Sequence, residues 1–347
     1  MNPALGNAVE RTYATNIPYV AGSNPTFALT NNELVETLQL TLSGTLTNTG
    51  YTTAPVKRVE GIENLIRKVN ITGNSRGSGR QSDTFTDVDF AFLAYQTRIL
   101  ETTAPARTDV GTANAIYNFA TTANKYFGFK RLGGNYALGF LDSRYLNSFN
   151  LGIQFRDLSA VIDPGTGVAG TSALSNVALQ VHSIHWEGGP LGVRAFYQKQ
   201  SQRQFDLTNL SSLNVPFANA PVGNFLQRQT FKTTVGDADY ADPSDAVLAT
   251  SLQAQGAFLQ VRQNDNFNSF QASISALKSK MKLDYSLESV PVGYTTAELS
   301  RTHTFADLLD ARNLRSGGLA NKLDLTTVAG SINTLQITDE QIVYRKA

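Results

Sequence analysis

One stretch of the chain matches the pattern that places a nucleophilic serine on a sharp turn. Gly73-Asn74-Ser75-Arg76-Gly77 has the G-x-S-x-G spacing, which requires a strand before the serine and a helix directly after it. A strand is expected before Ser75, but the run Arg-Gly-Ser-Gly-Arg-Gln-Ser follows, and a glycine-rich polar run is a poor start for a helix. We therefore expect a hairpin turn here and no catalytic serine.

The chain has three histidines, His182, His185 and His303. The first two lie three residues apart in a predicted strand, where successive side chains alternate between the two faces. They should therefore point to opposite faces and cannot share a metal ion. We expect ordinary strand or interface positions for them. No P-loop or dinucleotide-binding fingerprint is present, so the sequence predicts neither an enzyme nor a bound cofactor.

One loop is a weak candidate for a structural calcium ion because it holds four aspartates: Asp237, Asp239, Asp242 and Asp245. Calcium takes several oxygen ligands. The EF-hand spacing fails, however, since Ala241 and Leu248 occupy two of the ligand positions counted from Asp237. A solvated acidic loop without a metal ion is the alternative that we favour.

A short Leu-Asp-x-Arg motif occurs twice, with the pairs Asp142/Arg144 and Asp310/Arg312. In a strand, residues two positions apart point to the same face. An exposed ion pair of this kind contributes only about 0–1 kcal/mol. Because the pair recurs in both halves of the chain, a shared structural role at a pseudo-equivalent interface is one interpretation, and an ordinary exposed pair is the alternative that we favour.

The composition limits what these residues could do. The chain has 347 residues, and roughly 150 residues per domain gives about two domains. With 41% hydrophobic residues it is not disordered. The 29 basic residues balance 28 acidic ones, which argues against direct binding of nucleic acid. The absence of cysteine excludes thiolate zinc sites, cysteine nucleophiles and iron–sulfur clusters.

No targeting or membrane segment is expected. The N-terminus, Met1 to Ala14, lacks a basic start followed by an apolar run. The longest apolar stretches, such as Phe90 to Tyr95, are far shorter than the roughly 20 residues that cross a bilayer.

Most of the chain has the pattern of strands and turns. Leu38, Leu40 and Leu42 alternate with polar residues, the period of two that is typical of a half-buried strand. Clusters of Gly, Asn, Thr, Ser and Pro separate the apolar segments, so a sandwich or barrel is expected. Further strands are predicted at Ile66–Ile71, Phe149–Phe155, Val177–Trp186, Val193–Tyr197, Phe225–Thr233, Phe258–Val261, Lys322–Leu325 and Leu335–Tyr344.

Two apolar stripes with helical spacing interrupt this pattern, and both predict helices that pack on a core. The first stripe comprises Val88, Phe92, Tyr95 and Ile99. The second comprises Phe267, Phe270, Ile274, Leu277 and Met281.

An internal repeat suggests that the two domains are copies of one module. Four pairs of segments match in the same order, and their offset shrinks steadily along the chain, as expected if the first copy has longer loops. We expect the extra length in a surface loop over 101–130. The matching pairs are Asn16–Tyr19 with Asn214–Phe217, Leu65–Ile71 with Phe258–Val261, Leu141–Leu146 with Leu309–Leu314, and Leu179–Val181 with Leu335–Ile337. The predicted fold class is all-β with two flanking helices, arranged as tandem β-sandwiches.

This arrangement resembles the double jelly-roll major capsid proteins of tailless icosahedral, membrane-containing bacteriophages, in the adenovirus-hexon-like lineage. The resemblance extends from about Asn16 to Tyr344. It implies an N-terminal arm at 1–15, a first jelly roll at 16–195 with the loop at 101–130, and a second jelly roll at 196–347. The stretches that carry it are Asn214-Val-Pro-Phe…Pro221-Val-Gly-Asn-Phe-Leu226, Gly256-Ala-Phe-Leu-Gln-Val-Arg262 and Leu308-Leu-Asp-Ala-Arg312.

The resemblance implies a homotrimer whose six jelly rolls form a pseudo-hexagonal tile. Such tiles build the icosahedral shell of a virion around an internal membrane and the genome, with other capsid proteins as partners and the N-terminal arm facing the membrane. Two alternatives remain open. One is a secreted two-domain β-sandwich that binds or cleaves glycans, and the other is a minor capsid or spike protein.

Overall fold

The computed structural model divides into two compact units. The first comprises Met1–Lys130 and Gly134–Gln198, and the second comprises Arg131–Gly133 and Lys199–Lys346. The residues that the structure describes are 8–75, 82–101, 114–133, 136–163, 169–188, 196–207, 212–216, 224–236, 241–246, 258–264, 267–300, 303–304, 307–310, 320–324 and 330–344.

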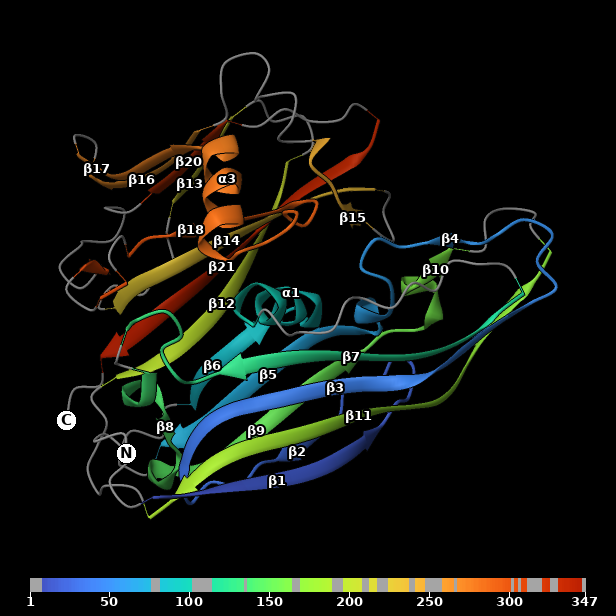
Figure 1. Cartoon of the computed structure of the whole chain (residues 1–347), viewed down its shortest axis with the longest axis horizontal. Coiled ribbons are helices and arrows are strands. Elements are labelled where there is room, and N and C mark those ends of the chain that lie inside the picture. The colour runs from blue at the N-terminus through green and yellow to red at the C-terminus, as the bar shows by residue number, and fades with distance from the viewer. Residues whose placement is uncertain are drawn as a thin grey trace. The chain divides into compact units, whose positions relative to one another are not determined.

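The first unit is built from two antiparallel sheets (Figure 1). Helix α1 (Phe90–Leu100) connects a strand of one sheet to a strand of the other. The first sheet has the order β1 (Val9–Pro18), β11 (Thr171–Glu187), β3 (Leu34–Thr49) and β7 (Ile116–Tyr126), with β8 (Leu141–Asp142) also paired to β3. The second has the order β6 (Ser82–Val88), β5 (Ile66–Ser75), β9 (Leu146–Phe155) and β2 (Thr26–Ala28).

Shorter elements complete the first unit. Strands β4 (Val56–Lys57) and β10 (Ile162–Asp163) form a two-stranded ladder. The single-turn helices are η1 (Gly61–Leu65), η2 (Tyr136–Gly139), η3 (Ser143–Tyr145) and η4 (Leu158–Ala160).

The apolar alternation of the strands forms the core of this unit. Leu38, Leu40 and Leu42 on β3 are fully buried, as the sequence pattern predicts. An aromatic cluster lies deeper in the unit, where the ring of Phe85 makes edge-on contacts with Phe127, Phe149 and Tyr197 at centroid distances of 5.4–6.2 Å. Burying such large side chains is the main source of stability in a domain of this size.

The second unit repeats these elements. Helix α3 (Ile274–Asp284) again follows the last strand of one sheet and precedes a strand of the other. One sheet has the order β12 (Phe196–Asp206), β21 (Ile332–Tyr344) and β14 (Asn224–Gly236), and β14 also pairs with β18 (Tyr294–Glu298), β19 (Leu309–Asp310) and β15 (Ala241–Pro243). The other has the order β17 (Phe267–Ser273), β16 (Phe258–Asn264), β20 (Ala320–Asp324) and β13 (Ser212–Pro216).

The two units have the same strand order. The order β1-β11-β3-β7 corresponds to β12-β21-β14-β18, and β6-β5-β9-β2 corresponds to β17-β16-β20-β13. Two four-stranded antiparallel sheets with these connections form an eight-stranded jelly roll. The chain is therefore a tandem double jelly roll, all-β with one flanking helix in each copy among the described residues, as the sequence predicts.

The duplication extends to the register of single residues. β8 pairs Asp142 with Leu34, and β19 pairs Asp310 with Phe225. A bulge follows at the same place in each copy, because the ladders skip Glu36 in β3 and Gln227 in β14. In the register that follows this bulge, Leu179 on β11 corresponds to Leu335 on β21. This confirms the match between Leu179–Val181 and Leu335–Ile337.

One of the four sequence matches pairs the wrong strands. Asn16 lies on β1, whereas Asn214 lies on β13, whose counterpart is β2. A match of four residues with an Asn-x-Pro pattern is too short to distinguish the end of one exposed strand from the end of its neighbour.

Three further expectations need correction. Residues 9–15 of the predicted arm belong to β1 (Val9–Pro18), which pairs along its whole length with β11, and Ile116–Tyr126 of the predicted loop is strand β7. Both strands are rich in small and polar residues, so their apolar contrast is weak. Phe267 and Phe270 lie on β17, and the helix begins only after Ser273, whose hydroxyl accepts a hydrogen bond from the Ala276 amide at 3.2 Å.

Gly139 offers a test of packing in the first unit. A Cβ there would lie 2.5 Å from Phe129 Cδ1 and 2.6 Å from the backbone oxygen of Phe127, which cannot rotate away. At Gly152 on β9 the nearest atom would be 3.7 Å away. Gly139→Ala should therefore lower the free energy of unfolding by about 1–3 kcal/mol, whereas Gly152→Ala should change it by less than about 1 kcal/mol. Urea denaturation measures both, and equal losses would contradict this account.

Candidate functional site

The serine motif lies in the wrong context for a nucleophile. Ser75 is the last residue of β5, and the strand that follows, β6, pairs with β5 in antiparallel fashion, for example Asn74 with Ser82. A strand and not a helix thus comes next among the described residues, while Arg76 to Gln81 lie outside them. The hydroxyl of Ser75 lies 3.5 Å from the carboxylate of Asp83. The geometry is that of a hairpin-paired strand, as expected.

The histidines occupy structural positions. His182 is half-buried on one face of β11 and His185 is fully buried on the other, so the expectation of opposite faces is confirmed. His303 lies with Nε2 at 3.4 Å from the guanidinium of Arg131. Among the described residues there is no group of three or more His, Asp or Glu side chains that could hold a metal ion.

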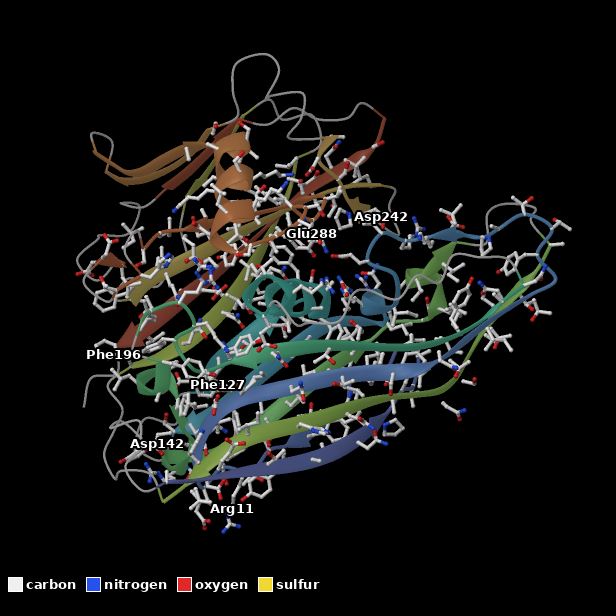
Figure 2. The ribbon with its side chains drawn as sticks, viewed as in Figure 1. Arg11, Phe127, Asp142, Phe196, Asp242 and Glu288 are labelled. Atoms are coloured by element: carbon white, nitrogen blue, oxygen red, sulfur yellow. The ribbon has the colours of Figure 1, made fainter. Side chains whose placement is uncertain are left out.

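The acidic loop is only partly described. Asp237 and Asp239 lie outside the described residues, while Asp242 is on β15 and Asp245 follows it (Figure 2). Asp245 Oδ1 accepts hydrogen bonds from the Lys278 ammonium on α3 and, at 2.8 Å, from the Gly293 amide. One carboxylate of the predicted calcium loop therefore already has a cationic partner within the chain. The calcium site stays a prediction.

The first Asp/Arg pair differs from the expected exposed strand pair. Asp142 ends β8 and is buried, and Arg144 lies in the single turn η3, so the two residues do not share a strand face. The guanidinium makes two hydrogen bonds to the carboxylate, at 2.8 and 2.6 Å, and Asp142 also accepts from the Arg144 amide at 3.2 Å. The pair thus closes the turn after β8; Asp142 is labelled in Figure 2.

Only the aspartate of the second pair lies among the described residues. Asp310 is half-buried at the end of β19, in the position that Asp142 holds on β8, and Arg312 lies outside the described residues. The recurrence therefore reflects equivalent positions in the two jelly rolls. A role of these residues at an interface between subunits stays a prediction.

Each helix supports the neighbouring strand through the same contacts in both units. The Asn124 amide on β7 donates to the hydroxyl of Thr97 at 2.7 Å, and the Thr296 amide on β18 donates to the sulfur of Met281 at 2.9 Å. One turn further, Tyr126 donates to Glu101 at the end of α1. In the second unit the tyrosine is on the helix side and the glutamate is on the strand.

In that unit, Tyr285 at the end of α3 donates to Glu298 on β18. Burial raises the pKa of both Tyr126 and Tyr285, and their carboxylate partners raise it further. Both hydroxyls therefore stay protonated and remain donors.

The second unit contains a buried charge cluster on β14. Arg228 donates to Glu298 at 2.7 Å and to Glu340 at 3.1 and 3.2 Å, and all three side chains are at most 2% exposed. Burial lowers the pKa of Arg228, but the carboxylates of Glu298 and Glu340 outweigh this effect and raise it well above its ordinary value. The equivalent positions of the first unit hold Thr37, Tyr126 and Ile184, so only one copy carries the cluster.

The first unit contains a different buried polar cluster, which ties β1 to its sheet. Tyr13 donates to Glu33 Oε1 at 2.7 Å and packs edge-on against the ring of His185 at 5.0 Å. The Nδ1 atom of His185 lies 3.5 Å from Glu33 Oε2. Burial lowers the pKa of His185 to about 4, so the imidazole is neutral at pH 7.

Sequence reasoning missed both clusters. The signal for the charge cluster is an arginine in the middle of a predicted strand, Phe225–Thr233, in a chain with only 16% charged residues. No pattern in the sequence identifies Glu298 and Glu340 as its partners, because they lie 70 and 112 residues away.

The comparisons with known proteins agree with this fold. No family model and no curated protein sequence matches the chain. The major capsid protein of Sulfolobus turreted icosahedral virus superimposes with a TM-score of 0.70 at 15% identity, covering 98% of this chain and 97% of that one. The major capsid protein P2 of bacteriophage PM2 gives 0.58 at 11% identity, covering 97% and 98%, and that of Faustovirus gives 0.57 at 8%, covering 98% and 91%.

What these proteins share with the chain is the double jelly roll over nearly the full length. No helix in the described part of the chain is long and apolar enough to cross a membrane.

Removing Arg228 tests the charge cluster. Arg228→Met removes the guanidinium between the buried carboxylates of Glu298 and Glu340, while Arg131 stays 3.7 Å from Glu298. We expect the free energy of unfolding to fall by about 3–5 kcal/mol. The control is Arg11→Met, which removes an exposed pair with Glu187 (Figure 2) and should cost less than about 1 kcal/mol. Chemical denaturation of both variants decides the point, and similar losses would contradict the burial argument.

The burial of His185 should make the folded chain less stable in mild acid. Its pKa is about 4 in the folded chain and about 6.5 unfolded, so between these values the unfolded state binds the extra proton. Stability should therefore fall as the pH drops below about 6.5, by about 2 kcal/mol between pH 7 and pH 5. Urea denaturation at both pH values measures this. In His185→Gln that share of the difference should disappear, and an unchanged difference would rule out His185 as its source.

Proposed function

We propose that this chain is a viral major capsid protein, whose function is assembly and not catalysis. The observation that carries the proposal is the pair of jelly rolls with identical strand order, which superimposes over 98% of the chain on the major capsid protein of Sulfolobus turreted icosahedral virus. Major capsid proteins of a bacteriophage and of Faustovirus have the same architecture. The chain would act in the capsid shell of a virion.

The mechanism is self-association into homotrimers, whose six jelly rolls make a pseudo-hexagonal tile. Obligate interfaces of this kind commonly bury 2,000 Å² or more. Because two jelly rolls are fused in one chain, fewer chains must associate, and less translational and rotational entropy is lost on assembly. Fusion also lets the two rolls diverge in sequence, so one tile can meet neighbours of different kinds.

Other partners follow from the position of a tile in such a shell. Neighbouring trimers and other capsid proteins would contact its sides, and the segment before β1 would face an internal membrane. Direct binding of nucleic acid is not part of the proposal, because 29 basic residues are offset by 28 acidic ones.

A glycan-binding or glycan-cleaving sandwich is less well supported. Such proteins present aromatic rings to the sugar, and the single tryptophan is used for packing instead. The Trp186 indole donates to Glu36 at 2.7 Å and stacks on Phe140 with a centroid distance of 6.4 Å. A minor capsid or spike protein could share the fold, and the copy number per particle separates that role from the major one.

The first test is the mass of the purified protein in solution. Light scattering after size-exclusion chromatography should give about 113 kDa, three times the 37.6 kDa of one chain, and electron microscopy should show hexagonal tiles or shells. A monodisperse monomer at micromolar concentration would overturn the proposal. Binding to a glycan array without any assembly would support the glycan alternative.

A further inference from the structure

The outer face of the first sheet of the first unit has no Asp, Glu, Lys or Arg over most of its length. In Figure 1 the strands β3 and β11 of this sheet are drawn in front of β9. We call the set of outward side chains the neutral face. Its members are Ala14 and Asn16 on β1; Gln39, Thr41, Ser43, Thr45 and Thr47 on β3; Ile116, Asn118, Ala120 and Thr122 on β7; and Ala173, Ser175, Ala178, Gln180 and His182 on β11.

Every side chain of the neutral face is exposed or half-buried, whereas alternate residues such as Leu40, Leu42 and Val181 are in the core. Polar groups of this face bind one another across the strands. Thr41 and Thr122 share a hydrogen bond of 3.1 Å, and the Thr45 hydroxyl donates to Asn118 Oδ1 at 2.9 Å. Removing water from groups that already have partners costs less than desolvating charged side chains.

In the second jelly roll the corresponding positions of β14 are buried. The counterparts of Gln39, Thr41 and Ser43 are Thr230, Lys232 and Thr234 on β14, and these are only 2%, 6% and 4% exposed. The same part of the sheet is thus covered in one copy and open in the other.

We propose that the neutral face binds a second copy of this chain in the assembled particle. The inference rests on the proposed function and names the surface through which it acts. The cores of protein interfaces are depleted of charged residues, and a partner that binds through charge, such as nucleic acid or an anionic membrane, finds no cation here. In an assembly of identical chains, the uncharged surface of another copy is available to pack against this face.

The size of the face is sufficient for such a contact. From Gln39 to Thr47 it extends about 26 Å along the strands, and four strands give a width of about 19 Å. A contact over this area buries on the order of 1,000 Å² in total, which is the lower bound for a specific interface.

The test introduces like charges into the face. Ser175→Lys combined with Gln180→Lys changes two exposed side chains and should weaken assembly at least tenfold, measured by sedimentation over a range of concentrations. The matched control, Val56→Lys with Leu283→Lys, adds the same charge at two exposed positions elsewhere and should assemble like the unmodified chain. Assembly of the face variant at the unmodified level would overturn the inference while leaving the proposed function intact.

A second measurement does not depend on how the lysine variant folds. Because the chain has no cysteine, Gln180→Cys and Leu283→Cys each create a single thiol. In assembled protein, maleimide should modify the thiol at position 180 at least tenfold more slowly than in dissociated protein, while the rate at position 283 stays unchanged. Equal rates at position 180 in assembled and dissociated protein would overturn the inference. Failure of the unmodified chain to assemble would instead remove the proposed function itself.

Discussion

The antiparallel pairing of β3 with β11, and of β14 with β21, is the constraint on which each jelly roll depends. These central strands carry the bulge that sets the register, and they pair in turn with β7 and β8 in one unit and with β18 and β19 in the other. A slip of one residue would turn every side chain to the opposite face. The bulge is therefore kept in both copies although the residues around it have changed.

On this common framework the two copies have acquired different electrostatics. The first unit places Thr37, Tyr126 and Ile184 where the second places Arg228, Glu298 and Glu340. A buried charge needs its partners at hydrogen-bond distance. The three differences between the copies at these positions therefore depend on one another. The outer positions Thr230, Lys232 and Thr234 of β14 are buried, whereas their counterparts Gln39, Thr41 and Ser43 of β3 are half-buried.

The sequence predicts the fold better than it predicts the buried polar groups. Alternating leucines such as Leu38 and Leu40 specify strands because burial of one face requires a period of two. The sequence predicts an arm and a loop where the structure has β1 and β7, because threonine, alanine and asparagine give little contrast between the two faces of a strand. The partners of Arg228 could not be found, since pairing over 70 and 112 residues depends on the register of the folded sheets.

The exchange between Tyr126 and Glu101 in one unit and Glu298 and Tyr285 in the other shows what the duplication has conserved. Each pair connects the end of a helix to the strand beside it, and either residue can stand on either element because a phenol donates and a carboxylate accepts. A comparison of residue identities scores these positions as unrelated. The hydrogen bond is nevertheless in the same place, so interactions that hold the helix survive after the sequence resemblance around them has been lost.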